Sequence, residues 1–219
     1  MLLIGDAFMK ILDIYKKYNI TENLQMHMLR VAACTNIIID NWNGIELNKE
    51  AIIKVSLLHD MGNIIKSKIY NNNSYNIDDS TIDYYINKYG TDDHYVTYQI
   101  CKELGFSDYE LYILNNKVSK ENEKIMKCDS FEIKICAYCD ERVSPYGVLS
   151  IINRLNDAKE RYKGKNDTWG NPEVANHLID CAIEIEKQIF KYCNIKPEDI
   201  NDNSIKGYID KLKEYEIRD

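Results

Sequence analysis

Glycine and proline are scarce in this chain, which has nine glycines and three prolines among 219 residues. Because a protein of many short strands needs frequent turns and bulges, their scarcity favours long helices. Uncharged apolar stretches are also short, and none reaches the about 18 residues that mark a membrane span. Asp6 and Lys10 interrupt the apolar N-terminal stretch before the core of a signal peptide can form.

A disulfide framework is absent as well. The seven cysteines are odd in number and follow no framework spacing. Cys136 and Cys139 form a C-x-x-C pair, but no second pair follows at the spacing of a zinc site, and on a helix the two share one face. We therefore expect free core thiols, a reducing cytoplasm as the location, and neither a zinc nor a redox site.

An excess of basic residues is lacking too, since the formal net charge is −7. Duplex nucleic acid and membranes are therefore not expected as partners. The hydrophobic share of 45% is ordinary for a globular protein and argues against disorder. No Gly-rich phosphate loop, dinucleotide fingerprint or Ser-His-Asp grouping occurs, which argues against a dinucleotide enzyme and a nucleophilic hydrolase.

Helical periodicity runs through almost the whole chain, and it predicts one all-α domain. Its core is expected at about 20–165, with extra helices at both ends and a C-terminal helical extension at about 171–215. The expected helices span about 6–18, 21–42, 48–68, 78–89, 91–104, 107–118, 130–144, 148–163, 172–192 and 203–215. We interpret 71–76, 119–127 and 164–170 as loops or links, the first either a solvated surface loop or part of the mouth of a site.

Two residue types that bind metals, His59 and Asp60, stand side by side where an apolar helical stretch ends. Ile52, Val55 and His59 recur at spacings of three and four, so they share the helix face that points into the core. A buried histidine and carboxylate need partners, because an unpaired buried charge costs several kcal/mol. A divalent metal ion would satisfy both groups at once.

Two further helices carry ligand types on mostly apolar surfaces. His27 lies beside a stripe that includes Met28, and Asp140 extends a stripe that includes Cys136. Two imidazoles and two carboxylates suit one divalent ion and leave a position open for water, which a catalytic site needs. Such water is easily deprotonated and can attack phosphorus. The ligand set does not distinguish Mn, Fe, Co, Ni, Zn and Mg.

The order His27, His59-Asp60, Asp140 resembles the HD-domain superfamily of metal-dependent phosphohydrolases. The segment 57–62 is similar to the family's dyad helix and 140–147 to its last-ligand segment, and the resemblance covers roughly 20–165. It implies a helical bundle, the four metal ligands and a catalytic part for Asp60. It also implies a small phosphorylated substrate, with nucleotides as the expected class, and it leaves open whether a phosphomonoester or a phosphodiester is cleaved.

Four residues near these ligands are candidates for contacts with substrate. Asn63 lies one turn after the dyad and is expected to hydrogen-bond the substrate, to orient a ligand or to cap the helix. Arg30 and Arg142 are each expected either to hold phosphate as a bidentate fork or to form a salt bridge. Lys66 is expected to reach a phosphate or to remain solvated.

His94 leaves two alternatives open. Some HD-domain branches place an extra histidine ligand on a similar helix to bind a second metal, but they add another histidine that this chain lacks between His94 and Asp140. We therefore expect one metal, with His94 lining the cleft, and His177 packed or on the surface. The alternatives are a dinuclear enzyme that recruits His94 and a catalytically silent, metal-binding regulatory module. The oligomeric state stays open.

Overall fold

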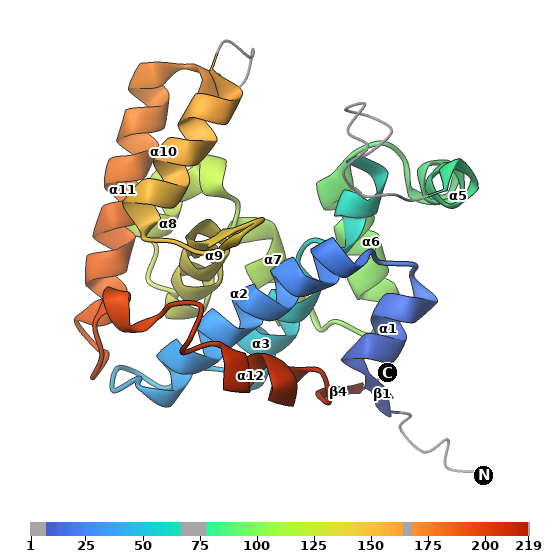
Figure 1. Ribbon diagram of the computed structural model, residues 1–219, viewed down its shortest axis with the longest axis horizontal. Helices are drawn as coiled ribbons and strands as arrows, with labels where there is room; N and C mark the ends of the chain where they lie inside the picture. Colours follow the sequence, from blue (N-terminus) through green and yellow to red (C-terminus); the bar gives the residue numbers. More distant parts are fainter. Residues whose placement is uncertain (1–7, 67–77, 164–167, 219) are drawn as a thin grey trace.

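The computed structural model describes residues 8–66, 78–163 and 168–218, and these residues are mostly helical, which confirms the all-α class (Figure 1). The α-helices are α1 (Ile11–Lys17), α2 (Glu22–Asp40), α3 (Lys49–Leu58), α5 (Asp79–Tyr89), α6 (Asp93–Glu103), α7 (Asp108–Asn116), α8 (Asn122–Lys127), α9 (Phe131–Arg142), α10 (Ile151–Tyr162), α11 (Pro172–Phe190) and α12 (Lys206–Leu212). Within these ranges, no helix has the length and apolar character to cross a membrane.

Short 3-10 turns and strands join these helices. The 3-10 turns are η1 (Met61–Ile65), η3 (Ser119–Glu121), η4 (Thr168–Gly170) and η5 (Pro197–Asp199). The antiparallel strand pairs are β1 (Phe8–Lys10) with β4 (Glu216–Arg218), and β2 (Val143–Ser144) with β3 (Gly147–Val148). The pair β1–β4 brings the two ends of the described chain together.

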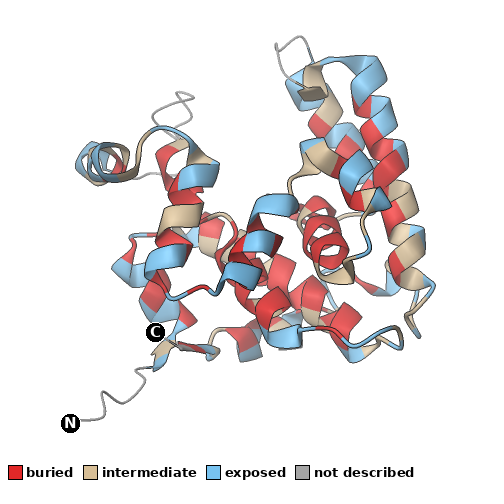
Figure 2. Ribbon diagram, turned by 180° about the vertical axis from the view of Figure 1, so that it is seen from behind, coloured by how far each residue is buried: buried red, intermediate tan, exposed pale blue. Residues whose placement is uncertain are grey.

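Helix α2 lies at the centre and packs against α3, α9 and α12. Its apolar residues recur on more than one face, so it is buried along most of its length, from Met28 to Ile39. Figure 2 shows the buried residues gathered in the middle of the molecule. The helices α10 and α11 pack on each other and on α9 at one end, and α5 and α6 lie at the other end (Figure 1).

Side-chain caps fix several helix starts as the sequence predicts. Asn48, Asp78 and Ser130 each accept a backbone N–H bond at the start of α3, α5 and α9. Thr21 and Thr91 also stand at predicted helix starts and are residue types that cap helices, but the Thr21 side chain makes no capping bond and Asp92 caps α6 in place of Thr91. Pro172 stands in the first turn of α11, as expected.

The predicted helix 48–68 is wrong in its second half. Helix α3 ends at Leu58, Asp60 has a φ of −120°, and η1 follows; positions 67–68 lie outside the described residues. The reason is a close approach to α6, where the Gly62 N–H donates to Thr97 Oγ1 at 2.8 Å. A Cβ on Gly62 would meet the Asp93 carbonyl oxygen at 2.0 Å, so this turn needs glycine.

Other boundaries also move. The expected link 119–127 contains η3 and α8, because Asn122 and Ile125 are buried as α8 packs on α11. The first helix starts at Ile11 after strand β1, and α9 ends at Arg142, where the β2–β3 hairpin begins. The expected loops at 71–76 and 164–167 lie outside the described residues, and 168–170 form η4.

Gly62→Ala is expected to lower the free energy of unfolding by about 1–3 kcal/mol, because the added methyl group pushes η1 away from α6. Chemical denaturation measures the change. Gly207→Ala in α12 is the matched control: nothing lies within 4 Å of its Cβ position, so it is expected to gain about 0.5–1 kcal/mol from helix propensity. Equal stability changes in the two variants would contradict the close approach.

Candidate metal centre

Four predicted ligands from three elements meet at one point. His27 comes from α2, His59 and Asp60 from the end of α3, and Asp140 from α9. His27 Nε2 lies 3.2 Å from Asp140 Oδ1 and 3.4 Å from Asp60 Oδ2. His59 Nε2 lies 3.3 Å from Asp140 Oδ1 and 3.7 Å from Asp60 Oδ2. Ligand atoms of His27, His59 and Asp60 fall within 4.8 Å of one another, so this group can hold a metal ion.

The tautomer of His59 is fixed by the backbone. Its Nδ1 lies 2.9 Å from the Ser56 carbonyl oxygen, so Nδ1–H donates there and Nε2 is the nitrogen turned toward the two carboxylates. Nε2 is buried and has no hydrogen-bond partner in the part of the chain that the structure describes. In the neutral ring this nitrogen carries a lone pair that faces the oxygens of two carboxylates, and a divalent ion between them satisfies all three groups.

The break after α3 positions Asp60. Outside the helix, the Asp60 backbone turns so that its carboxylate reaches His27 and His59 from the side of η1. The predicted helix 48–68 would carry both members of the dyad on one continuous helix, where adjacent side chains point about 100° apart. The side chains of His59 and Asp60 do reach the same cluster, as predicted, but the backbone at Asp60 is not helical.

Both carboxylates are ionised. Burial by itself would raise the pKa of Asp140, but Lys117 and the two histidines outweigh burial and hold that pKa well below its usual range. The pKa of Asp60 is lowered in the same way, since His59, His27 and Lys66 together outweigh burial and the neighbouring Asp140. Ionised carboxylates are the form that coordinates a divalent ion.

Lys117, which the sequence analysis did not single out, is the direct partner of the cluster. It follows the last turn of α7, is buried, and donates from Nζ to Asp140 Oδ2 at 2.6 Å. Asp140 therefore uses one oxygen for Lys117 and turns the other to the histidines. A lysine after a polar stretch such as 115–116 carries no sequence pattern that marks it as buried.

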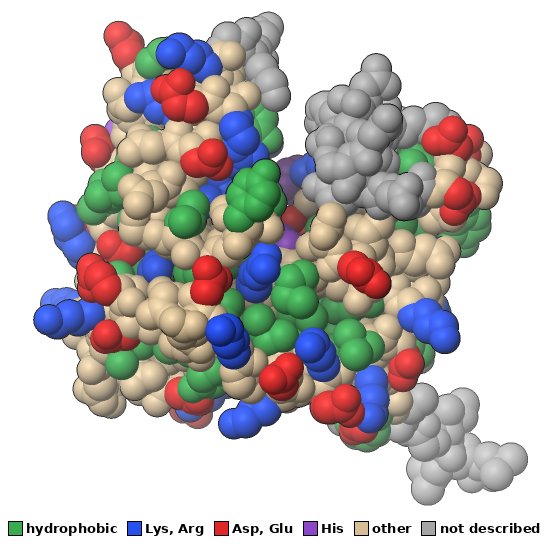
Figure 3. Space-filling view, viewed as in Figure 1, with side chains coloured by type: hydrophobic (Ala, Val, Ile, Leu, Met, Phe, Trp, Pro, Cys, Tyr) green, Lys and Arg blue, Asp and Glu red, His purple; other side chains and the backbone are tan. Residues whose placement is uncertain are grey.

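A cavity of about 410 Å³ opens beside the cluster. Figure 3 shows a hollow there, with histidine, acidic and basic side chains at its bottom. Of the predicted residues, Asn63, Lys66 and His94 line the cavity, and Lys66 Nζ pairs with Asp93 at 2.9 Å. The lining residues that the sequence analysis did not propose include Thr97, Asn115, Lys117, Ser119, Lys120, Glu141, Arg154, Arg161, Tyr162, Thr168 and Trp169.

Arg30 and Arg142, each predicted either to hold phosphate or to form a salt bridge, do not line this cavity. Arg142 is buried, and its guanidinium donates to the Tyr138 hydroxyl and to backbone carbonyls of 149, 197 and 200, so no N–H remains for a phosphate. Its role is to hold the C-terminal segment against α9. Arg30 Nη1 donates to the Pro145 carbonyl oxygen at 3.2 Å.

The remaining candidates lie where the sequence placed them. All seven cysteines are free, and Cys136 and Cys139 are buried as expected for core thiols. His177 is exposed and pairs with Glu123, 3.3 Å from Nε2. His94 is exposed on α6 at the cavity lining.

Asp60→Ala is expected to remove most of the stabilisation that a bound metal gives. In wild type this stabilisation is about 2.7 kcal/mol when metal stands at about 100 times its dissociation constant. The variant loses it because one of the four ligand groups is gone, while the metal-free proteins are expected to differ less. Thermal melts of both proteins with and without metal measure the effect.

Asp210→Ala is the control for this melt, because Asp210 is an exposed aspartate paired only with Lys213 among the described residues. It is expected to keep the full metal-induced shift. If metal raised the melting temperatures of Asp60→Ala and wild type equally, Asp60 would not be a ligand.

Comparison with known proteins adds no family to this geometry. No protein-family profile, curated protein or solved structure matches the chain. What the site can bind therefore follows from its donor atoms, their burial and the cavity beside them.

Proposed function

We propose that this protein is a metal-dependent phosphohydrolase of the HD-domain type, acting on a small phosphate ester, with nucleotides as the expected class. One observation carries the proposal: the buried His59 Nε2, unpartnered among the described residues, faces the carboxylates of Asp60 and Asp140 at the bottom of a cavity with several basic side chains in its lining. The first half of this observation calls for a cation, and the second half calls for an anionic ligand.

The chemistry of the donor set supports one divalent ion. His27, His59, Asp60 and Asp140 offer two imidazoles and two ionised carboxylates, a mixed set that several first-row metals and Mg accept. A bound ion supplies Lewis acidity toward water and toward phosphoryl oxygens. The cavity beside the cluster gives a phosphate ester room to reach it.

The protein's own residues orient the ligands and the substrate. The Ser56 carbonyl holds the His59 ring in one tautomer, and Lys117 fixes the Asp140 carboxylate. Asn63 lines the cavity beside the dyad, where its amide can donate to a phosphoryl oxygen. Lys66 adds positive charge at the same wall.

The order of the ligands along the chain supports the HD-domain type. A first histidine on α2, a dyad where α3 ends and a last aspartate on α9 follow the family's order, and the three helices pack on one another. The protein surface here is acidic overall, with a net charge of −7, so a local basic lining marks this cavity as the place for an anion.

His94 keeps the dinuclear alternative open, because it lines the same cavity from α6. Elemental analysis of the metal-loaded protein separates the two cases. One metal per chain is the expected result, and two metals per chain would assign a second site to His94. Metal binding without turnover of any substrate would instead favour the silent regulatory module.

Phosphate release from nucleoside mono- and triphosphates is expected with at least one of Mn, Co, Ni and Mg. His59→Ala is expected to reduce the release to background, because it removes the imidazole that faces both carboxylates. His177→Ala is the matched control and is expected to keep full activity, since His177 is exposed and absent from the cavity lining.

The assay measures inorganic phosphate or the dephosphorylated nucleoside. If His59→Ala released phosphate as fast as wild type, the reaction would not occur at this metal centre. An inactive wild type that nevertheless binds one metal per chain would argue against hydrolysis and for the regulatory module.

A further inference from the structure

A second buried atom without a partner belongs to a wall of the same cavity. Arg154 lies on α10 and lines the cavity, and its Nε donates to the Val143 carbonyl oxygen at 2.9 Å. Its Nη1 is buried and has no hydrogen-bond partner among the described residues. The nearest carboxylate oxygen that pairs with it, on Asp157, is 3.8 Å away. A half-buried guanidinium with a buried, unpartnered nitrogen needs an anionic ligand, as the carboxylates around His59 need a cation.

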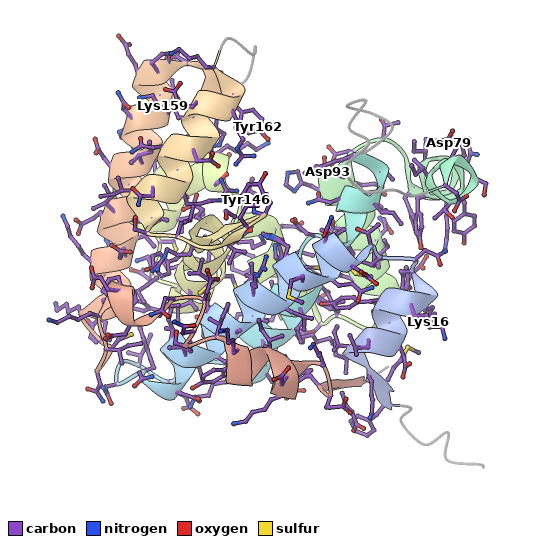
Figure 4. The ribbon with its side chains drawn as sticks, viewed as in Figure 1. Lys16, Asp79, Asp93, Tyr146, Lys159 and Tyr162 are labelled. Carbon is purple, nitrogen blue, oxygen red and sulfur yellow. The ribbon has the colours of Figure 1, made fainter. Side chains whose placement is uncertain are left out.

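The periodicity of α10 turns one face of the helix toward the cavity. Its lining residues recur at helical spacing, and they are Arg154, Leu155, Ala158, Arg161 and Tyr162. Figure 4 shows Tyr162 on the side of α10 that faces Asp93 across the molecule. The other aromatic side chain of the lining, Trp169, comes from η4.

Most basic side chains of the lining already have carboxylate partners. Lys117 pairs with Asp140, Lys66 with Asp93, and Arg161 with Asp157. Lys120 also lines the cavity but is exposed, whereas Arg154 has a buried Nη1 and only a loose contact with Asp157, so its guanidinium is the best placed of the lining cations to bind an anion. A guanidinium binds a phosphate more specifically than an ammonium group does, because its N–H groups form a fork.

We propose that the α10 side of the cavity is the substrate-binding subsite, where Arg154 holds the phosphate and Trp169 stacks on a planar ring of the same ligand. The inference rests on the proposed function, since it places the phosphate between Arg154 and the metal centre. The ligand is thus a phosphate monoester of a ring compound, with a nucleoside monophosphate as the matching chemistry. A cavity of about 410 Å³ is within the range that encloses ligands of this size.

Stacking on an indole is tolerant of the base, because every base offers a flat π-face. Arg154 and Trp169 therefore account for the ester and the ring but do not select one base. The subsite predicts preference for nucleoside monophosphates over sugar phosphates, with modest differences between bases.

Binding can be read without turnover from tryptophan fluorescence and calorimetry. The chain has two tryptophans, and Trp42 packs against Phe131 and Tyr192 away from the cavity lining. Quenching by AMP is therefore expected to persist in Trp42→Phe and to vanish in Trp169→Phe. The full chain is titrated without metal, and with metal by rapid mixing so that binding is read before turnover.

The probes separate the two halves of the ligand. Wild type is expected to bind AMP from about 5-fold to about 150-fold more tightly than ribose 5-phosphate, and Trp169→Leu is expected to remove that difference. Arg154→Gln is expected to weaken AMP and ribose 5-phosphate alike by about 10-fold or more and to leave adenosine unchanged. Arg30→Gln and Tyr146→Leu are the controls, because neither residue lines the cavity.

Arg154→Lys is the conservative variant, because it keeps the positive charge but loses the forked N–H groups. Its affinity for AMP is expected to fall between those of wild type and Arg154→Gln. Thermal melts confirm that each variant is folded. Unchanged AMP affinity in Arg154→Gln, or equal losses for AMP and ribose 5-phosphate in Trp169→Leu, would overturn the subsite. If the binding pattern holds but no metal supports turnover, the subsite stands and the proposed hydrolysis fails. If wild type hydrolyses AMP but the Arg154 and Trp169 variants bind AMP as wild type does, the hydrolysis stands and the subsite fails.

Discussion

The site depends on one electrostatic constraint: imidazole nitrogens and carboxylate oxygens lie close together at its centre. Asp140 Oδ1 lies 3.2 Å from His27 Nε2 and 3.3 Å from His59 Nε2, and the Ser56 carbonyl fixes the His59 proton on the far nitrogen. Such atoms repel one another unless a proton or a metal ion lies between them. The three helices α2, α3 and α9 hold this arrangement because they are packed together by the apolar core.

Two departures from regular helix serve that constraint. The chain leaves the helix after Leu58, which lets Asp60 approach the histidines, and Gly62 lets the following turn lie against α6. Lys117 then offsets the negative charge of Asp140 from the opposite side. The site thus combines rigid helices that carry His27 and Asp140 with one irregular turn, which is a common way for proteins to aim a ligand.

Periodicity and residue type predict most helices and the four residues that meet in the cluster. They succeed where one face of a helix is apolar, as along α2 and α9, because burial determines which way a side chain points. They fail at Gly62, at Arg142 and at Arg154, where tertiary contacts decide. The Gly62 turn depends on α6, and Arg142 depends on carbonyls far along the chain. Arg154 lines a cavity whose other lining residues come from η1, α6, α7, η3, α9 and η4, which no local pattern reveals.

Arg142 also sets an order of events during synthesis. It lies two residues after Asp140 and donates to the carbonyl oxygen of Pro197, 55 positions later. The end of α9 therefore cannot make its final contacts until the ribosome has released those later residues. At about 5–20 residues per second, that is a delay of roughly 3–11 s after Arg142 is made. Through this interval the Arg142 guanidinium lacks its acceptors at Pro197 and Ile200, so the end of the helix that bears Asp140 reaches its final contacts late in synthesis.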